Sequence, residues 1–181
     1  MTDTDQHALD SFPRWLRTLG DDVVALASTL TDGSLAPEVR LWSAAAVGYL
    51  FKSLDLVPDG IQDLGFLDDA MVLRVAAKNA TEEPDYSGSR GNLVLEGLAA
   101  DAELVEAFLA DQAPRLSRYV SELRVALSRG RSPSDVVEDS ALAVQVVEDA
   151  RSWSASYEPP LFAGDKRTLT KLRAFLLTKL P

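Results

Sequence analysis

Cysteine is absent from this 181-residue sequence, and histidine occurs only once, as His7. Without cysteine the chain has no disulfide, no thiolate nucleophile and no cysteine-ligated metal. We expect His7 to lie in a solvent-exposed terminal segment. A Ser-His-Asp triad, a histidine general base and a histidine-rich metal site therefore lack their essential residue.

A long apolar run is also missing. The longest charge-free stretch near the centre of the chain, residues 41–51, is bounded by Arg40 and Lys52. A membrane-spanning helix needs about 20 apolar residues, so this stretch is too short. The first ten residues are acidic and contain no apolar core of a signal peptide. We therefore expect a soluble, cytoplasmic protein.

Positive charge is scarce, since the formal net charge is -10 at neutral pH. Binding to nucleic acid requires a basic face that neutralises phosphates, so the composition argues against a nucleic-acid partner. The charge is unevenly distributed: residues 81–112 are strongly acidic, whereas residues 113–131 and 161–181 are basic. We expect these segments to attract one another within one fold.

Apolar residues recur at helical spacing over most of the chain, and no strand-like alternation of useful length competes with them. The sequence therefore predicts an all-α protein, a compact domain of about six or seven helices. We expect a disordered tail at 1–10 and one helical domain at 11–181, divided into a core at about 34–80 and a helical extension at 81–181. The expected helices begin near Pro13, with a break near Gly20, and then cover residues 37–52, 68–80, 92–110 (with a candidate interruption near Ala100), 114–129, 132–153 and 165–180.

Residues 49–73 differ from the rest, because proline, glycine and aspartate occur there at close spacing between two apolar segments. Pro58 disfavours helical geometry at the residue before it, and Gly60 and Gly65 permit backbone angles that other residues resist. The pattern predicts a helix-loop-helix hairpin with an acidic loop.

The same stretch contains a spaced set of apolar, aspartate, proline and glycine residues: Tyr49, Leu50, Leu54-Asp55-Leu56-Val57-Pro58-Asp59, Ile61 and Leu64-Gly65-Phe66-Leu67-Asp68-Asp69. This set resembles the signature of the YkvA-like family, a bacterial domain of unknown function. The resemblance covers about residues 34–80 and implies a small helical domain with no established activity. Two prolines of the family pattern are replaced, by Ser53 and Gln62, so we expect a less rigid loop than is typical.

The loop supplies the candidate site residues, which are Asp55, Asp59, Asp63, Asp68 and Asp69. Oxygen ligands in a turn suit a hard cation such as Mg²⁺ or Ca²⁺. An EF-hand is excluded by spacing, since hydrophobic residues occupy two positions that require oxygen ligands.

A structural interpretation competes with the cation site. Asp55 can close the end of the preceding helix, Asp59 can bond loop amides, and Asp68 can cap the next helix. Asp63 and Asp69 would then be solvated charges. On this interpretation the protein needs no cofactor.

The sequence favours a non-enzymatic interaction or scaffold module, with a protein partner of unknown identity. One alternative is a divalent-cation-dependent hydrolase or ligand site at the acidic loop. Another is a peripheral membrane protein that uses the basic C-terminal helix. The net charge argues against an anionic membrane, so we expect that helix to pack on its own chain through a leucine stripe, Leu169, Leu172, Leu176 and Leu180.

Overall fold

The computed structural model describes residues 2–52, 55–61, 64–86 and 92–181. Within these ranges the chain forms eight α-helices and three short 3₁₀ helices, and no strand. The all-α prediction is confirmed. The α-helices are α1 (Asp3–Ser28), α2 (Pro37–Leu50), α3 (Leu67–Thr81), α4 (Leu93–Leu109), α5 (Ala113–Glu122), α6 (Pro133–Glu138), α7 (Ser140–Ser156) and α8 (Lys166–Lys179). The 3₁₀ helices are η1 (Thr29–Thr31), η2 (Ala110–Gln112) and η3 (Leu123–Val125).

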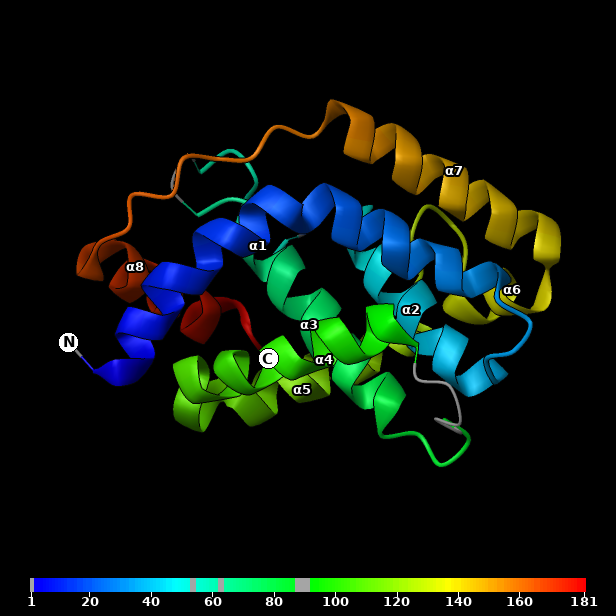
Figure 1. The fold of residues 1–181 in the computed structure, drawn as a ribbon, viewed down its shortest axis with the longest axis horizontal. Coiled ribbons are helices and arrows are strands. Elements are labelled where there is room, and N and C mark those ends of the chain that lie inside the picture. The colour runs from blue at the N-terminus through cyan, green and yellow to red at the C-terminus, as the bar shows by residue number, and fades with distance from the viewer. Residues whose placement is uncertain (1, 53–54, 62–63, 87–91) are drawn as a thin grey trace.

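The centre of the molecule is α3, in which every residue from 67 to 77 is buried. Its most extensive contacts are with α4 and with α2, and α7 packs along α1 (Figure 1). One apolar cluster includes buried residues from α1 to α5, α7 and α8, and a smaller cluster joins α6 to α2 and α7. The predicted hairpin therefore lies inside a shell made by the other helices.

The first helix starts much earlier than the sequence suggested. Thr2 caps α1 through a reciprocal hydrogen-bonded box with Asp5, so residues 3–10 are helical and not a disordered tail. Pro13 lies inside this 26-residue helix instead of opening it. Burial of an apolar face against the core stabilises the helix through the proline, as tertiary packing often overrides local propensity.

Gly20 does not break α1 either, because its role is to permit close packing. A Cβ atom placed there would lie 2.7 Å from Oγ of Ser154 on α7. The absence of a side chain at residue 20 leaves room for the Ser154 hydroxyl between α1 and α7, and a Cβ atom there would force that hydroxyl to rotate away. Gly20 thus lies at a contact between two helices, whereas the sequence alone predicts a helix break there.

The predicted helices at 37–52 and 68–80 are confirmed as α2 and α3, and α4 runs without interruption. The helix predicted for 114–129 is shorter, since α5 and η3 together end at Val125. The helix predicted for 132–153 is two helices, because Asp139 adopts an extended conformation and caps α7. A residue that suits a cap can end one helix and start the next, and the apolar periodicity does not reveal this.

The C-terminal helix packs on its own chain. Its four stripe leucines are each at most 2% exposed. Two arginines of α5 hold its end: Arg115 donates to Leu180 O and, at 3.0 Å, to Pro181 O, and Arg118 donates to Pro181 O at 2.8 Å. Within the described residues, no helix is long and apolar enough to cross a membrane.

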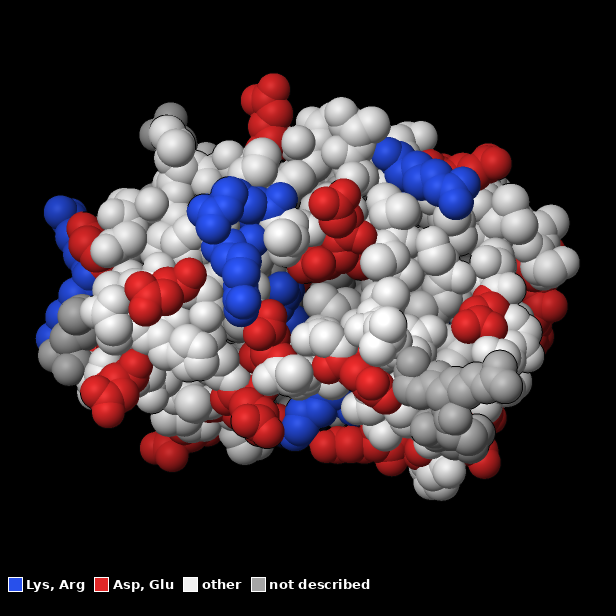
Figure 2. Space-filling model, in the orientation of Figure 1, with Lys and Arg blue, Asp and Glu red and all other residues white. Residues whose placement is uncertain are grey.

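A buried arginine joins three of the helices. Arg74 of α3 is only 2% exposed and pairs with Asp22 of α1 at 3.1 Å and Asp101 of α4 at 3.2 Å. Its guanidinium also lies 4.2 Å from the ring centroid of Trp15. On the face in Figure 2, acidic side chains are spread widely and basic ones form a few separate groups. One ion pair between the predicted acidic and basic segments joins Arg124 to Glu83, at 3.9 Å.

Candidate functional site

The acidic loop is tied to both helices of the hairpin by one buried carboxylate. Oδ2 of Asp68 accepts hydrogen bonds from the Tyr49 hydroxyl at 2.5 Å and from the Val57 amide at 3.0 Å. The Tyr49 hydroxyl in turn accepts from the Leu56 amide at 2.9 Å. Asp68 and Tyr49 are both fully buried. A residue of α2, two loop amides and a residue of α3 therefore meet in one hydrogen-bonded joint.

The end of the loop is closed by backbone packing. A Cβ atom at Gly65 would lie 2.3 Å from the backbone oxygen of Asp59, so the chain passes itself where only glycine fits. Phe66 follows in the left-handed region, with φ 65°, and directs the chain into α3. Its ring packs edge-on against Trp153 and Tyr157, at centroid distances of 5.9 and 5.2 Å. The loop is thereby docked onto α7 and the segment after it.

These contacts correct the capping interpretation. The N-cap of α3 is Phe66, which makes no side-chain cap, and Asp68 instead anchors the loop from the first helical turn. Asp69 is 2% exposed and is not a solvated charge. Neither Asp55 nor Asp59 makes a side-chain hydrogen bond within the part of the chain that the structure describes. Asp63, with Ser53 and Gln62, lies outside the described residues.

The four described aspartates influence one another's charge. Burial, aided by neighbouring carboxylates, raises the pKa of Asp59 to about 6, although its side chain is partly exposed. Burial raises the pKa of Asp68 to about 6, against the hydrogen bonds from Tyr49 and Val57 that favour its charged form. Burial and the charge of Asp68 raise the pKa of Asp69 well above its usual value, and burial raises the pKa of Asp55. Since Asp68 accepts the two hydrogen bonds, we place the proton of the Asp68–Asp69 pair on Asp69.

The cation hypothesis is not supported by the geometry of this cluster. Among the described residues, no three histidine, cysteine, aspartate or glutamate side chains are placed to hold a metal ion. One observation remains in its favour. Oδ1 of Asp68 is buried and has no hydrogen-bond partner among the described atoms, which is uncommon for a carboxylate oxygen.

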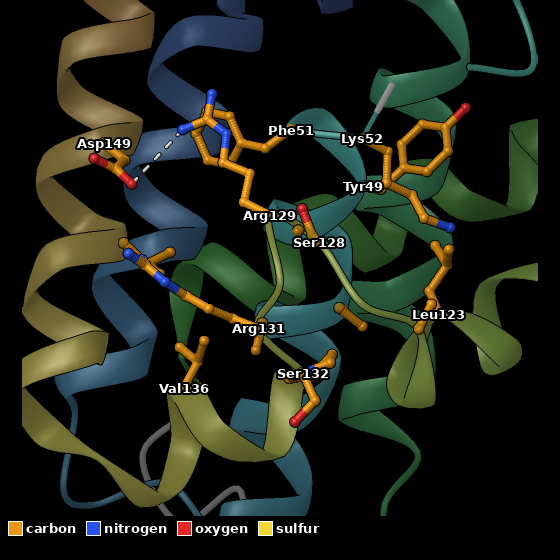
Figure 3. Close-up of a pocket in the computed structure, with 16 residues that line it drawn as sticks. Tyr49, Phe51, Lys52, Leu123, Ser128, Arg129, Arg131, Ser132, Val136 and Asp149 are labelled. Atoms are coloured by element: carbon orange, nitrogen blue, oxygen red, sulfur yellow. Dashed lines mark ion pairs between the residues drawn. The ribbon is translucent and has the colours of Figure 1, made fainter. Parts of the chain in front are cut away.

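A pocket opens on the other side of the end of α2, between α2, α6, α7 and the segment that joins η3 to α6 (Figure 3). It is a small cavity of about 40 Å³ that opens to solvent. Its floor is apolar and its rim carries three cationic side chains, Lys52, Arg129 and Arg131. In Figure 3 the two arginines extend towards α7 and Lys52 lies on the side of Leu123.

Sequence reasoning missed this pocket. It placed Arg129 at the end of a helix and Gly130 after it, whereas the two residues form a tight turn closed by hydrogen bonds between Ser128 and Arg131. The available signal was the Arg-Gly-Arg run just before the Ser-Pro that opens α6. Local sequence could indicate the turn, but not that α2 and α7 would lie beside it.

A comparison with known families bears on the hairpin. Residues 39–74 match the family model of a protein of unknown function, DUF1232. No curated protein and no solved structure matches the chain. The DUF1232 match covers most of α2, the loop and the first half of α3, and supports an uncharacterised domain there.

The matched segment contains the whole buried joint. Tyr49, Gly65 and Asp68 lie within it, as does Lys52 of the pocket rim. Arg129 and Arg131 lie outside it, in the part of the chain that no comparison covers. The joint therefore lies within the segment that matches the DUF1232 model, and the pocket is assembled by adding α6, α7 and their connections to that hairpin.

Proposed function

We propose that this protein is a non-enzymatic interaction or scaffold module built on a structural hairpin. The observation that carries the proposal is the use of Asp68, the most buried of the four candidate aspartates that the structure describes, to hold the loop to Tyr49 and Val57. A carboxylate that anchors two buried donors is poorly available as a metal ligand or a catalytic base. The residues most suited to chemistry are thus explained by the fold.

The proposal includes the wider organisation of the chain. The hairpin is of the YkvA-like type, and the chain from the start of α1 to residue 181 forms one domain in which 81–181 cover the core. The single apolar cluster shared by most of the helices supports this. We also propose that the protein acts in the cytoplasm and binds a protein partner. Its acidic surface suits neither nucleic acid nor an anionic membrane.

A divalent-cation site at the loop is the second candidate, and the unpartnered Oδ1 of Asp68 favours it. A cation bound there would be expected to contact Asp68 with one or more neighbouring aspartates, and could support hydrolysis. The two candidates differ in a measurable way. A bound cation stabilises the folded state in proportion to its concentration, whereas a purely structural joint does not respond to it.

Unfolding with and without Mg²⁺ or Ca²⁺ therefore tests the proposal. Asp68→Ala leaves the Tyr49 hydroxyl and the Val57 amide without their acceptor, and each buried unpaired donor costs about 1–3 kcal/mol. We expect a loss of about 2–4 kcal/mol in the free energy of unfolding, equal in chelator and in millimolar cation. Asp68→Asn keeps an acceptor and should lose less. Asp21→Ala, at an exposed position of α1, is the control and should change stability little.

A cation-dependent rise in the melting temperature of the wild type, abolished in Asp68→Asn and Asp69→Asn but kept in Asp21→Ala, would contradict the proposal. It would establish the loop as a cation site. No rise in the melting temperature at millimolar cation would exclude a cation-dependent hydrolase at the loop.

A further inference from the structure

We propose that the pocket between α2, α6 and α7 binds a small amphipathic anion, a carboxylate carried on a short unbranched alkyl chain. The inference goes beyond the proposed function and does not depend on the role of the acidic loop. It rests on the shape of the pocket, the sign of its charge and the backbone conformation that places that charge.

The floor of the pocket suits an apolar chain. Small residues of α2, Ala44, Ala45 and Gly48, face Val136 of α6 and Val146 of α7 across it. Gly48 adds no side chain to the floor, and a Cβ atom there would lie in ordinary contact, 3.5 Å, with Cβ of Ser128, so only a larger side chain would fill the space. Because the cavity is only about 40 Å³, the pocket is narrow, and a slim alkyl chain fits it better than a ring system.

The rim suits an anionic head. Three cations and one acid, Asp149, line the pocket, so its formal charge is +2 (three positive charges less one) on a chain of -10. Asp149 lies 3.8 Å from Arg129, too far for a direct hydrogen bond. Arg131 makes no side-chain ion pair or hydrogen bond with any described residue. Two guanidinium groups on one side of a pocket present the planar donor pairs that carboxylates bind.

The backbone shows that this arrangement is not incidental. Arg129 has φ 50°, in the left-handed region that residues with a Cβ rarely adopt. Two-residue turns of this kind favour asparagine or glycine at that place, yet the chain has arginine there. The strained residue holds its guanidinium 4.4 Å from the ring centroid of Phe51, above the pocket. Strain of this kind persists where the surrounding structure imposes it and points to a functional role.

The test uses octanoate as the probe and the full chain, with calorimetric titration and amide chemical shifts as readouts. Octanoate should bind saturably at one site, and the shifts should map to α2, α6 and α7. Octanol, which lacks the charge, and acetate, which lacks the chain, should each bind at least about tenfold more weakly. Inorganic phosphate should not compete.

The variants separate the rim from the floor. Arg131→Gln should weaken octanoate binding about tenfold, while Arg151→Gln, an exposed arginine of α7 outside the pocket, should leave it unchanged. Asp149→Asn should tighten binding, because it removes the acid that competes for Arg129. Gly48→Leu should abolish binding by filling the floor, and circular dichroism should show each variant folded.

Three results would overturn the proposal. The first is no saturable octanoate binding at millimolar concentration. The second is equal binding of octanol, which would make the pocket a neutral apolar site. The third is a general attraction of anions, shown either by equal weakening in Arg131→Gln and Arg151→Gln or by competition from phosphate.

Discussion

Gly65 and Asp68 give the loop its shape through two different constraints. Gly65 leaves room for the Asp59 backbone, and Asp68 supplies the acceptor that two buried donors need. The first constraint is steric and independent of pH, whereas the second is electrostatic. Both act within the DUF1232 match, so the loop is a folded part of that segment and not only a connection.

Gly65→Ala should destabilise the protein by about 3 kcal/mol, the upper range for overpacking, because its Cβ would meet a backbone oxygen that cannot rotate away. Gly60→Ala is the matched control in the same loop, since nothing lies within 4 Å of its Cβ position. Urea unfolding of both variants measures the difference. Equal stability of the two would mean that the loop moves freely and that the close approach is not required.

At the scale of the helix, α1 and α8 stabilise each other across the whole length of the sequence. Arg173 of α8 donates to Oδ1 of Asp5 at 2.8 Å and to the Phe108 carbonyl at 3.1 Å, with its guanidinium 4.0 Å from the Phe108 ring centroid. The hydrogen bond from Arg173 lowers the pKa of Asp5. The first turn of α1, which sequence assigned to a tail, is therefore part of the folded body (Figure 1).

A double-mutant cycle on Asp5 and Arg173 should show this coupling. Asp5→Asn and Arg173→Gln should each cost about 1–2 kcal/mol, since each removes a hydrogen bond to a charged group that is partly or wholly buried. The double variant should cost less than the sum of the two. Arg167→Gln, exposed on the same helix, is the control. Strictly additive losses would contradict a direct interaction between the two helices.

The whole molecule combines a high negative charge with carboxylates buried at its centre. Asp68 and Asp69 lie in the helix that contacts most of the others, and burial opposes their ionisation. Burial also raises the pKa of Asp22, against the attraction of Arg74. By contrast, Asp5 and Asp165 have lowered pKa values. Their contribution to the stability of the folded state is therefore lost only when the pH falls into the acid range and they take up a proton.

Stability should therefore rise as the pH falls from about 7 to about 5, by on the order of 1–2 kcal/mol. A carboxyl whose pKa is higher in the folded than in the unfolded chain binds its proton more readily when folded. Its destabilising effect is present when the pH is above the folded pKa, and it declines as the pH falls towards the unfolded pKa near 3.8.

Denaturant unfolding across this pH range measures the slope. Asp69→Asn should flatten it, while Asp21→Asn at an exposed site should not. An unchanged slope in Asp69→Asn would assign the effect to the net charge of the surface and not to the buried pair.

Sequence alone determined the helical class, the α2–α3 hairpin and the stripe of α8, because apolar periodicity and the Pro, Gly and Asp positions are local signals. Sequence alone also identified, as candidate site residues, the four loop aspartates that the structure describes. It could not determine that Asp68 would face Tyr49 instead of capping α3, since that depends on how α2 lies against the loop.

Tertiary packing decided the rest. The docking of the first turn of α1 and the close approach at Gly20 depend on contacts with elements distant in sequence, whereas the helix break at Asp139 is made by a local cap. The pocket joins Lys52 to Arg131 across segments that no local pattern relates. A sequence specifies which residues favour burial or a turn, but the neighbours that bury them, and the charges that then meet, exist only once the chain has folded.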